Sequence, residues 1–112
     1  MVIIEKEVPL QSVIGMQENY FGDMVKGVVD VRRGLLAVDA ELHADLEKLL
    51  LENGSEQPDL WGINLYPELE GDDFLEFDSM INIRPHQDNP SRDVLDPDVR
   101  ERIKSIVHKL IV

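Results

Sequence analysis

Apolar positions along the chain predict eight elements in the order β-α-β-β-α-β-β-α. Short apolar runs at residues 2–4, 24–31 and 35–39 have the length of strands, and Gly34 suits the tight turn between the second and third. Two longer strands are predicted at 61–66 and 75–84, where apolar and polar side chains alternate with a period of two. A helix cannot satisfy that period, so both segments are assigned to the sheet.

Three other segments have the spacing of amphipathic helices. The first follows Pro9 and ends near Gly22. The second carries a leucine stripe, with Asp39 as its expected cap and Asn53-Gly54 as its stop; the stripe is Leu42, Leu46, Leu49 and Leu50. The third begins at Asp96-Pro97-Asp98, a cap, a first-turn proline and a carboxylate that suits the helix dipole.

These elements predict an α+β fold in which three helices pack on one face of one mainly antiparallel five-stranded sheet. Strands joined by short turns pair antiparallel, and the helices supply apolar stripes to cover one sheet face. Trp61 shares the parity of Ile63 and Leu65, so we expect it to be buried beneath the helices. The 112 residues suit one core, and residues 1–112 are expected to form a single α+β domain.

The composition limits the possible partners. There are 23 acidic and 11 basic residues, a formal net charge of −12, so the chain should be repelled by nucleic acid and by anionic lipid. We therefore expect no nucleic-acid partner and no membrane partner. There is no cysteine, no long apolar run and no recognisable signal peptide, which together favour a cytoplasmic protein.

The charge is divided unevenly along the chain. Residues 39–78 hold 13 acidic residues and one basic residue, whereas residues 79–112 hold five acidic and six basic residues. The simplest interpretation is two solvated faces that attract each other within the domain or between protomers. The acidic stretch would also suit a basic protein partner.

The sheet face opposite the expected helices carries the candidate site. By strand parity it displays polar side chains among a few apolar ones, namely Lys26, Asp30, Asn64, Tyr66, Glu76, Asp78, Asn82 and Arg84 with Met24, Val28 and Met80. Asn and Asp are poor strand formers, so specific hydrogen bonds should hold Asn64, Asp78 and Asn82. Their partners would come from a second protomer, from solvent on a wet face, or from a ligand.

Other candidate chemistry is sparse. Glu76-x-Asp78 places two carboxylates on one face, which suits a hard cation or an acid and base pair, but Lys26 and Arg84 would neutralise them. We predict no metal and no cofactor. Among the histidines, His43 is expected to be an ion-paired surface residue and His108 to complement a helix dipole.

The loop of residues 85–96 concentrates donors and acceptors. His86 is the best-placed histidine for a site, and Arg84 and Arg92 flank amides that would suit a carboxylate or phosphate. The alternative is an ordered loop whose polar side chains satisfy its own backbone. The candidate ligand or interface residues are therefore Asn64, Tyr66, Glu76, Asp78, Asn82, Arg84, His86 and Arg92.

The stretches ELHADLE, LWGINLYP and FDSMINIRP carry a resemblance that runs over nearly the whole chain. The sequence resembles a small conserved prokaryotic family known only as a domain of unknown function. This resemblance implies a self-contained cytoplasmic protein, and it transfers no activity, substrate, cofactor or catalytic residue.

Two classes of function fit these observations. The first is a non-enzymatic binding or regulatory protein that forms a homodimer through the polar sheet face. The second is a small enzyme or ligand-binding protein that uses this face and the 85–96 loop. A weaker idea is an acidic partner for a basic protein. The sequence leaves open whether there is catalysis, because it contains no recognisable catalytic motif.

Overall fold

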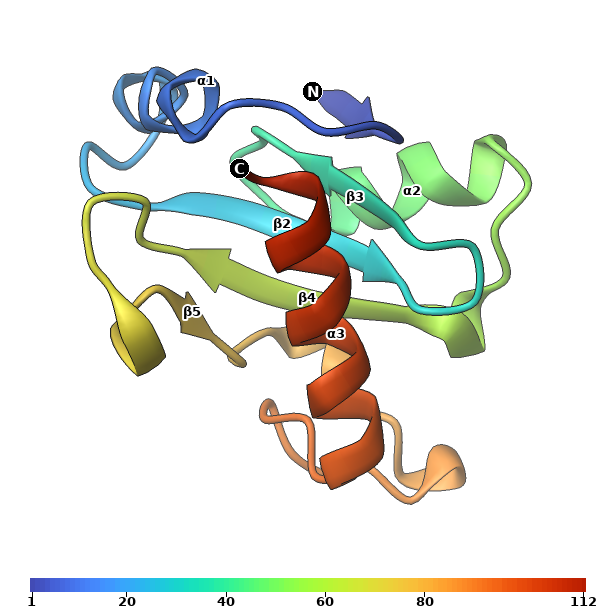
Figure 1. The fold of residues 1–112 in the computed structure, drawn as a ribbon. Helices are drawn as coiled ribbons and strands as arrows, with labels where there is room; N and C mark the ends of the chain where they lie inside the picture. The colour runs from blue at the N-terminus through green and yellow to red at the C-terminus, as the bar shows by residue number, and fades with distance from the viewer.

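Five strands form one antiparallel sheet in the computed structural model, which describes residues 1–112 (Figure 1). The strand order is β1-β3-β2-β4-β5, and every neighbouring pair is antiparallel. The strands are β1 (Val2–Ile4), β2 (Val25–Asp30), β3 (Leu35–Val38), β4 (Leu60–Leu65) and β5 (Leu75–Glu76). The helices are α1 (Leu10–Ile14), α2 (His43–Glu52) and α3 (Pro97–Leu110). The predicted α+β fold with five strands and three helices is confirmed.

The prediction that all three helices pack on one sheet face is wrong. In Figure 1, α3 crosses in front of the strands and α2 lies behind them. The side chains form two clusters accordingly: Val29 and Leu36 pack toward α3, whereas Val28 and Ala37 pack with Leu46 of α2. The central strands β2 and β3 are apolar on both faces, so each face needs a cover.

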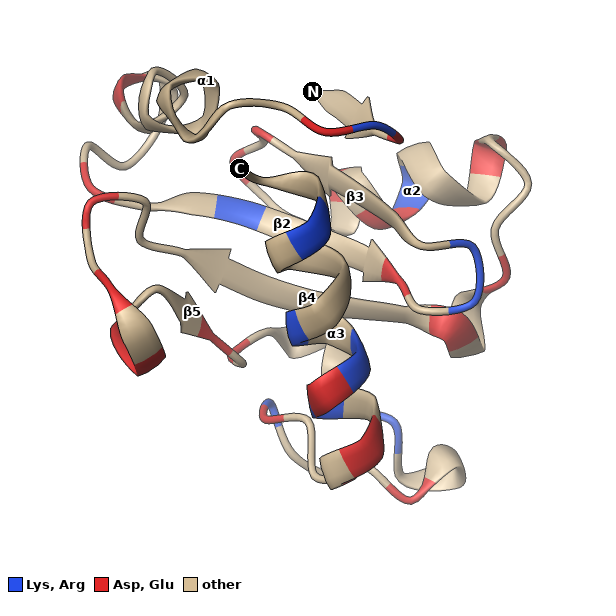
Figure 2. Ribbon diagram, in the orientation of Figure 1, with Lys and Arg blue, Asp and Glu red and all other residues tan.

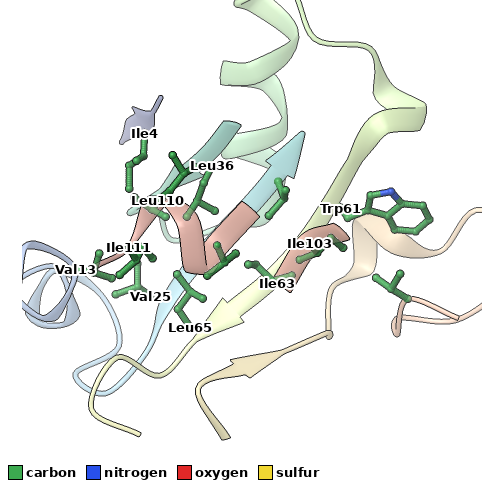
Figure 3. Close-up of a cluster of buried hydrophobic side chains, with 14 residues drawn as sticks. Ile4, Val13, Val25, Leu36, Trp61, Ile63, Leu65, Ile103, Leu110 and Ile111 are labelled. Atoms are coloured by element: carbon green, nitrogen blue, oxygen red, sulfur yellow. The ribbon is translucent and has the colours of Figure 1, made fainter. Parts of the chain in front are cut away.

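The larger cluster lies between α3 and the sheet, and α1 contributes Val13 to it (Figure 3). Its 14 buried members are Ile4, Val13, Val25, Val29, Leu36, Val38, Trp61, Ile63, Leu65, Val94, Ile103, Val107, Leu110 and Ile111. Trp61 is 5% exposed, which confirms its predicted burial. None of the three helices combines the length and the apolarity needed to cross a bilayer.

The predicted strand at residues 75–84 is wrong beyond Glu76. β5 has only two residues, and the chain then leaves the sheet and makes a 3₁₀ turn at Met80–Asn82. The Asn82 side chain takes over the pairing, because its Oδ1 accepts from the Gly62 N–H at 2.8 Å and its Nδ2 donates to the Gly62 carbonyl at 3.0 Å. Period-two alternation is thus produced here by a packed loop.

Gly62 permits this loop to lie directly on β4. A Cβ built at Gly62 would lie 2.5 Å from both the Cβ and the Oγ of Ser79, closer than real side chains approach. Asn89 then fixes the rest of the loop, since its Nδ2 donates to the carbonyls of Asn82 and Asp93 and its Oδ1 accepts from the Leu95 N–H. The 85–96 loop therefore satisfies its own backbone.

The helix signals are confirmed at some ends and wrong at others. α3 starts at Pro97, and the Asp96 carboxylate caps it by accepting from the Asp98 N–H at 2.9 Å. Gly54, at φ +100°, follows α2 as expected. Asp39 does not cap α2, because it adopts φ +75° four residues before His43 and accepts hydrogen bonds from Asn19.

We expect Ile103→Ala to lower the free energy of unfolding by about 2–5 kcal/mol, because it leaves a cavity under α3. Asp96→Ala should cost less, about 0.5–2 kcal/mol, because it removes a single exposed cap. Urea denaturation of both variants checks the ranking. A larger loss for Asp96→Ala than for Ile103→Ala would contradict the placement of α3.

Candidate functional site

The helix α2 leaves part of its sheet face open. It covers β2 and β3 at Val28 and Ala37, whereas a hollow of about 450 Å³ remains beside its first turn. The walls come from β2, β4, β5, α2 and the segments around residues 21 and 80. They are Phe21, Met24, Lys26, Leu42, His43, Ala44, Asn64, Tyr66, Glu76, Asp78, Ser79, Met80, Ile81 and Arg92. The hollow therefore collects five of the eight candidate residues, four of them on or just after β4 and β5 and the fifth, Arg92, from the loop.

A polar row crosses the floor of this hollow. Strand register places Lys26 of β2 opposite Asn64 of β4, and Asn64 opposite Glu76 of β5. The Asn64 Nδ2 donates to Glu76 Oε1 at 2.8 Å and to the Asp78 carbonyl at 3.2 Å. Asn64 is only 6% exposed, and its buried Oδ1 has no hydrogen-bond partner. An unpaired buried acceptor is costly, and the side chain of His43 is the polar group beside it.

The two ends of the row carry opposite charges without opposite-charge partners. Glu76 accepts from neutral donors only, the amide of Asn64 and the Tyr66 hydroxyl at 3.3 Å. Lys26 forms no ion pair, and its Nζ lies 5.1 Å from the centre of the Phe21 ring. The hollow thus offers one free carboxylate and one free ammonium group.

The pKa of Tyr66 is raised by its position at the acidic end of the hollow. Burial raises the pKa of its hydroxyl, and the carboxylate of Glu76 raises the pKa further, with smaller contributions from Asp23 and Asp78. The phenol is therefore held in its neutral form and acts as a hydrogen-bond donor to Glu76.

Asp78 and Arg92 close one side of the hollow with an ion pair. The Arg92 Nε lies 2.6 Å from Asp78 Oδ1, and Arg92 Nη1 lies 3.7 Å from the Met80 sulfur. These two charges neutralise each other at a partly exposed position, where an ion pair contributes little stability. The structure thus brings together five of the eight candidate residues, Asn64, Tyr66, Glu76, Asp78 and Arg92.

Asn82, Arg84 and His86 lie elsewhere. Asn82 is fully buried against Gly62, and Arg84 donates to the carbonyls of Gln57 at 2.6 Å and Leu60 at 2.7 Å. The Arg84 guanidinium also lies 4.1 Å from the centre of the Trp61 ring. His86 is exposed on the loop and does not line the hollow. Asn82 and Arg84 therefore hold the loop against β4.

His43 is the residue of the hollow that the sequence interpretation missed. The expectation of an ion-paired surface histidine is wrong, because His43 is 8% exposed and its Nε2 lies 2.8 Å from the Ile63 carbonyl. Since that carbonyl only accepts, Nε2 must carry the proton. Burial lowers the pKa of His43, although the hydrogen bond to Ile63 opposes this shift. The signal lay in the spacing His43, Leu46, Leu50, which is the buried face of α2.

No metal cluster accompanies these groups. The carboxylates Glu76 and Asp78 and the imidazole of His43 share the hollow, but no group of three or more His, Asp or Glu side chains is arranged to hold a metal ion.

The lowered pKa of His43 predicts a pH-dependent loss of stability. In the unfolded chain the imidazole takes up a proton around its ordinary pKa of about 6.5, whereas in the folded chain it stays neutral to lower pH. Acid therefore favours the unfolded state through this residue, and the loss begins as the pH falls through that ordinary value. His43→Gln removes this contribution while keeping a donor for Ile63.

The free energy of unfolding of wild type relative to His43→Gln should consequently fall between about pH 7 and pH 5. Urea denaturation across this range measures it, and His86→Gln at an exposed loop position is the matched control. A constant difference between wild type and His43→Gln would contradict the buried neutral imidazole.

Comparison with known proteins identifies a family and no close relative of established structure. No curated protein and no solved structure matches the chain. One family model, described as "Protein of unknown function (DUF5674)", matches residues 2–110. This confirms the resemblance to a family of unknown function, because the match covers nearly the whole chain of 112 residues. The chain belongs to the DUF5674 family.

Proposed function

We propose that this protein is a non-enzymatic binding domain whose site is the hollow beside α2. Its ligand is a small bipolar organic molecule, with an ammonium group at one end and a carboxylate at the other, as in an α-amino acid. The observation that carries the proposal is the polar row Lys26–Asn64–Glu76, in which two opposite charges without ion-pair partners lie on either side of Asn64.

The spacing of the row suits such a ligand. Neighbouring strands lie about 4.8 Å apart, so the backbones at Lys26 and Glu76 are separated by about 10 Å. Both side chains line the hollow, and that of Glu76 reaches the Asn64 side chain of the central strand. A ligand ammonium group would bind Glu76, and a ligand carboxylate would bind the Lys26 Nζ.

The apolar walls suit the uncharged part of the ligand. Met24 and Ile81 line the hollow. Met80 and Leu42 also line it, and these two side chains are 66% and 54% exposed. Methionine side chains adapt to ligands of different shape. Burial of these side chains against a ligand would add the hydrophobic contribution that charge pairing alone lacks.

Binding alone accounts for these groups better than catalysis does. A general base needs a free basic atom within reach of the substrate. His43 donates its Nε2 proton to the Ile63 carbonyl, and burial lowers its pKa and so weakens the basic Nδ1 that remains. The Ser79 side chain is 1% exposed and its Oγ accepts from the Ile81 N–H. The carboxylate of Glu76 has no ion-pair partner and is placed to pair with a cation.

The test is a titration of the ¹⁵N-labelled protein with free L-amino acids, followed by NMR chemical shifts. Saturable shifts are expected at the backbone of Lys26 and at the side-chain amide of Asn64 for a subset of the amino acids. Glu76→Gln and Lys26→Met should each weaken binding by about tenfold or more, because each removes one charged hydrogen bond.

Two sets of controls make the result specific. Glu68→Gln and Lys48→Met remove the same charges at exposed positions outside the hollow and should bind normally. The N-acetyl and amide derivatives of a binding amino acid each lose one charge and should bind more weakly. If no amino acid shifts these signals, or if derivatives bind equally well, the bipolar ligand is wrong.

A homodimer through the same face is the second candidate function, favoured by the exposed rim of Leu42 and Met80. Across a two-fold axis, Lys26 of one protomer would meet Glu76 of the other. Sedimentation equilibrium of the titration sample distinguishes the candidates. A wild-type monomer at high micromolar concentration excludes the dimer, whereas a dimer that Lys26→Met weakens supports it.

A further inference from the structure

A second hollow lies on the other side of the molecule, between α3 and the turn that joins β2 to β3. Its volume is about 410 Å³. It is lined by Glu5, Arg32, Arg33, Gly34, Arg102, Ser105, Ile106, Lys109 and Leu110. Figure 2 shows basic residues on this turn and both basic and acidic residues along α3. Four of the 11 basic residues of the chain line this one hollow.

One wall is a stripe on α3. Arg102, Ser105 and Lys109 are spaced i, i+3 and i+7, so they lie on one face of the helix, with about 10 Å between the first and the last along the axis. The Arg102 Nε donates to the Val31 carbonyl, which orients the guanidinium and leaves its two terminal nitrogens free. Lys109 forms no ion pair.

The opposite wall is a turn held rigidly by Asp30. This fully buried carboxylate accepts from the backbone N–H groups of Arg32 and Arg33, both at 2.9 Å, and from the Ser55 hydroxyl at 2.7 Å. Arg33 is anchored in turn to the Ser55 Oγ and to Asn53. The turn is therefore a fixed wall, and Gly34 at its tip has no neighbouring atom where a side chain would stand.

Most basic side chains of this hollow have no ion-pair partner within the protein. Arg32 pairs with Asp59, but Arg33, Arg102 and Lys109 have no carboxylate partner, and Glu5 is the one acidic residue in the lining. In a chain with 23 acidic and 11 basic residues, cations have an ample supply of possible partners. Three that remain unpaired around one hollow indicate a site for an external anion.

We propose that this hollow binds a small phosphate-bearing anion. A guanidinium fork, a hydroxyl and an ammonium group approach from α3, and they match the several oxygens of a tetrahedral phosphate better than the two oxygens of a carboxylate. The net charge of −12 repels a polyanion far more than a single phosphate, so the ligand is a small molecule and not a nucleic acid.

The experiment is an NMR titration of the ¹⁵N-labelled full chain with inorganic phosphate at constant ionic strength. Saturable shifts are expected at the backbone amides of Gly34 and Ser105. Arg102→Gln and Lys109→Gln should each weaken the apparent affinity about tenfold or more. Lys48→Gln, on the opposite side of the sheet, is the matched control and should leave the affinity unchanged. Lys109 makes no internal ion pair, so Lys109→Gln keeps the test valid if Arg102→Gln unfolds.

Three further probes decide the chemical class. Glycerol phosphate should bind at least as well as inorganic phosphate, whereas acetate and a short single-stranded oligothymidylate should bind much more weakly. Shifts that do not saturate, or an affinity unchanged in Lys109→Gln, would overturn the site. Acetate binding as tightly as phosphate, or tighter binding of the oligonucleotide at equal phosphate concentration, would overturn the assignment of a small phosphate ligand.

Discussion

The side-chain carboxamide of Asn82 makes the two hydrogen bonds to β4 that a neighbouring strand would otherwise make. β5 pairs with β4 only at Asn64 and Leu65, and the edge of β4 at Gly62 would be left with an unpaired N–H and carbonyl in a buried position. Asn82 supplies one acceptor and one donor to that residue, as a neighbouring strand would. The chain after β5 is thereby freed to leave the sheet without an unsatisfied edge.

The candidate site depends on these two hydrogen bonds between Asn82 and Gly62. Because the chain turns away after Glu76, Asp78 and Ser79 form one wall of the hollow, and Met80 reaches its rim. A continuous strand through residue 84 would have placed these side chains alternately on the two sheet faces. Asn89 and Arg84 then hold the returning loop, which brings Arg92 within 2.6 Å of Asp78.

The two sides of the sheet differ in their cover. α3, with 14 residues, spans about 21 Å and covers the strands of its face, whereas α2, with 10 residues, spans about 15 Å over β2 and β3. The shorter cover leaves the hollow with Lys26 and Glu76 open. The basic hollow beside α3 lies on the other face, so the two proposed sites are separated by the sheet.

The sequence predicts the parts of this fold that local rules control. Asp96 and Pro97 specify where α3 begins, and the parity of Trp61 with its neighbours predicts its burial. The side of the sheet that α2 covers could not be predicted, because a stripe of leucines fits either face. The buried face of α2 includes His43, which is not part of the leucine stripe used to predict that face.

Only those parts of the candidate site that follow local rules could be predicted from the sequence. Asn64, Tyr66 and Glu76 follow strand parity, and the structure places them together. Asn82 and Arg84 follow the same parity but belong to a loop. Their side chains bond to backbone atoms that lie 20 to 27 residues away in the sequence. Long-range hydrogen bonds of this kind leave no periodic signal in a single sequence.

The most direct test of this account is a measurement of scalar couplings across hydrogen bonds in ¹⁵N,¹³C-labelled protein. The structure predicts a coupling between the Gly62 backbone nitrogen and the side-chain Cγ of Asn82, since that carboxamide accepts the Gly62 N–H at 2.8 Å. A coupling from the Gly62 nitrogen to a backbone carbonyl of residues 75–84 instead would show a continuous strand. It would contradict both the role of Asn82 and the hollow that this role creates.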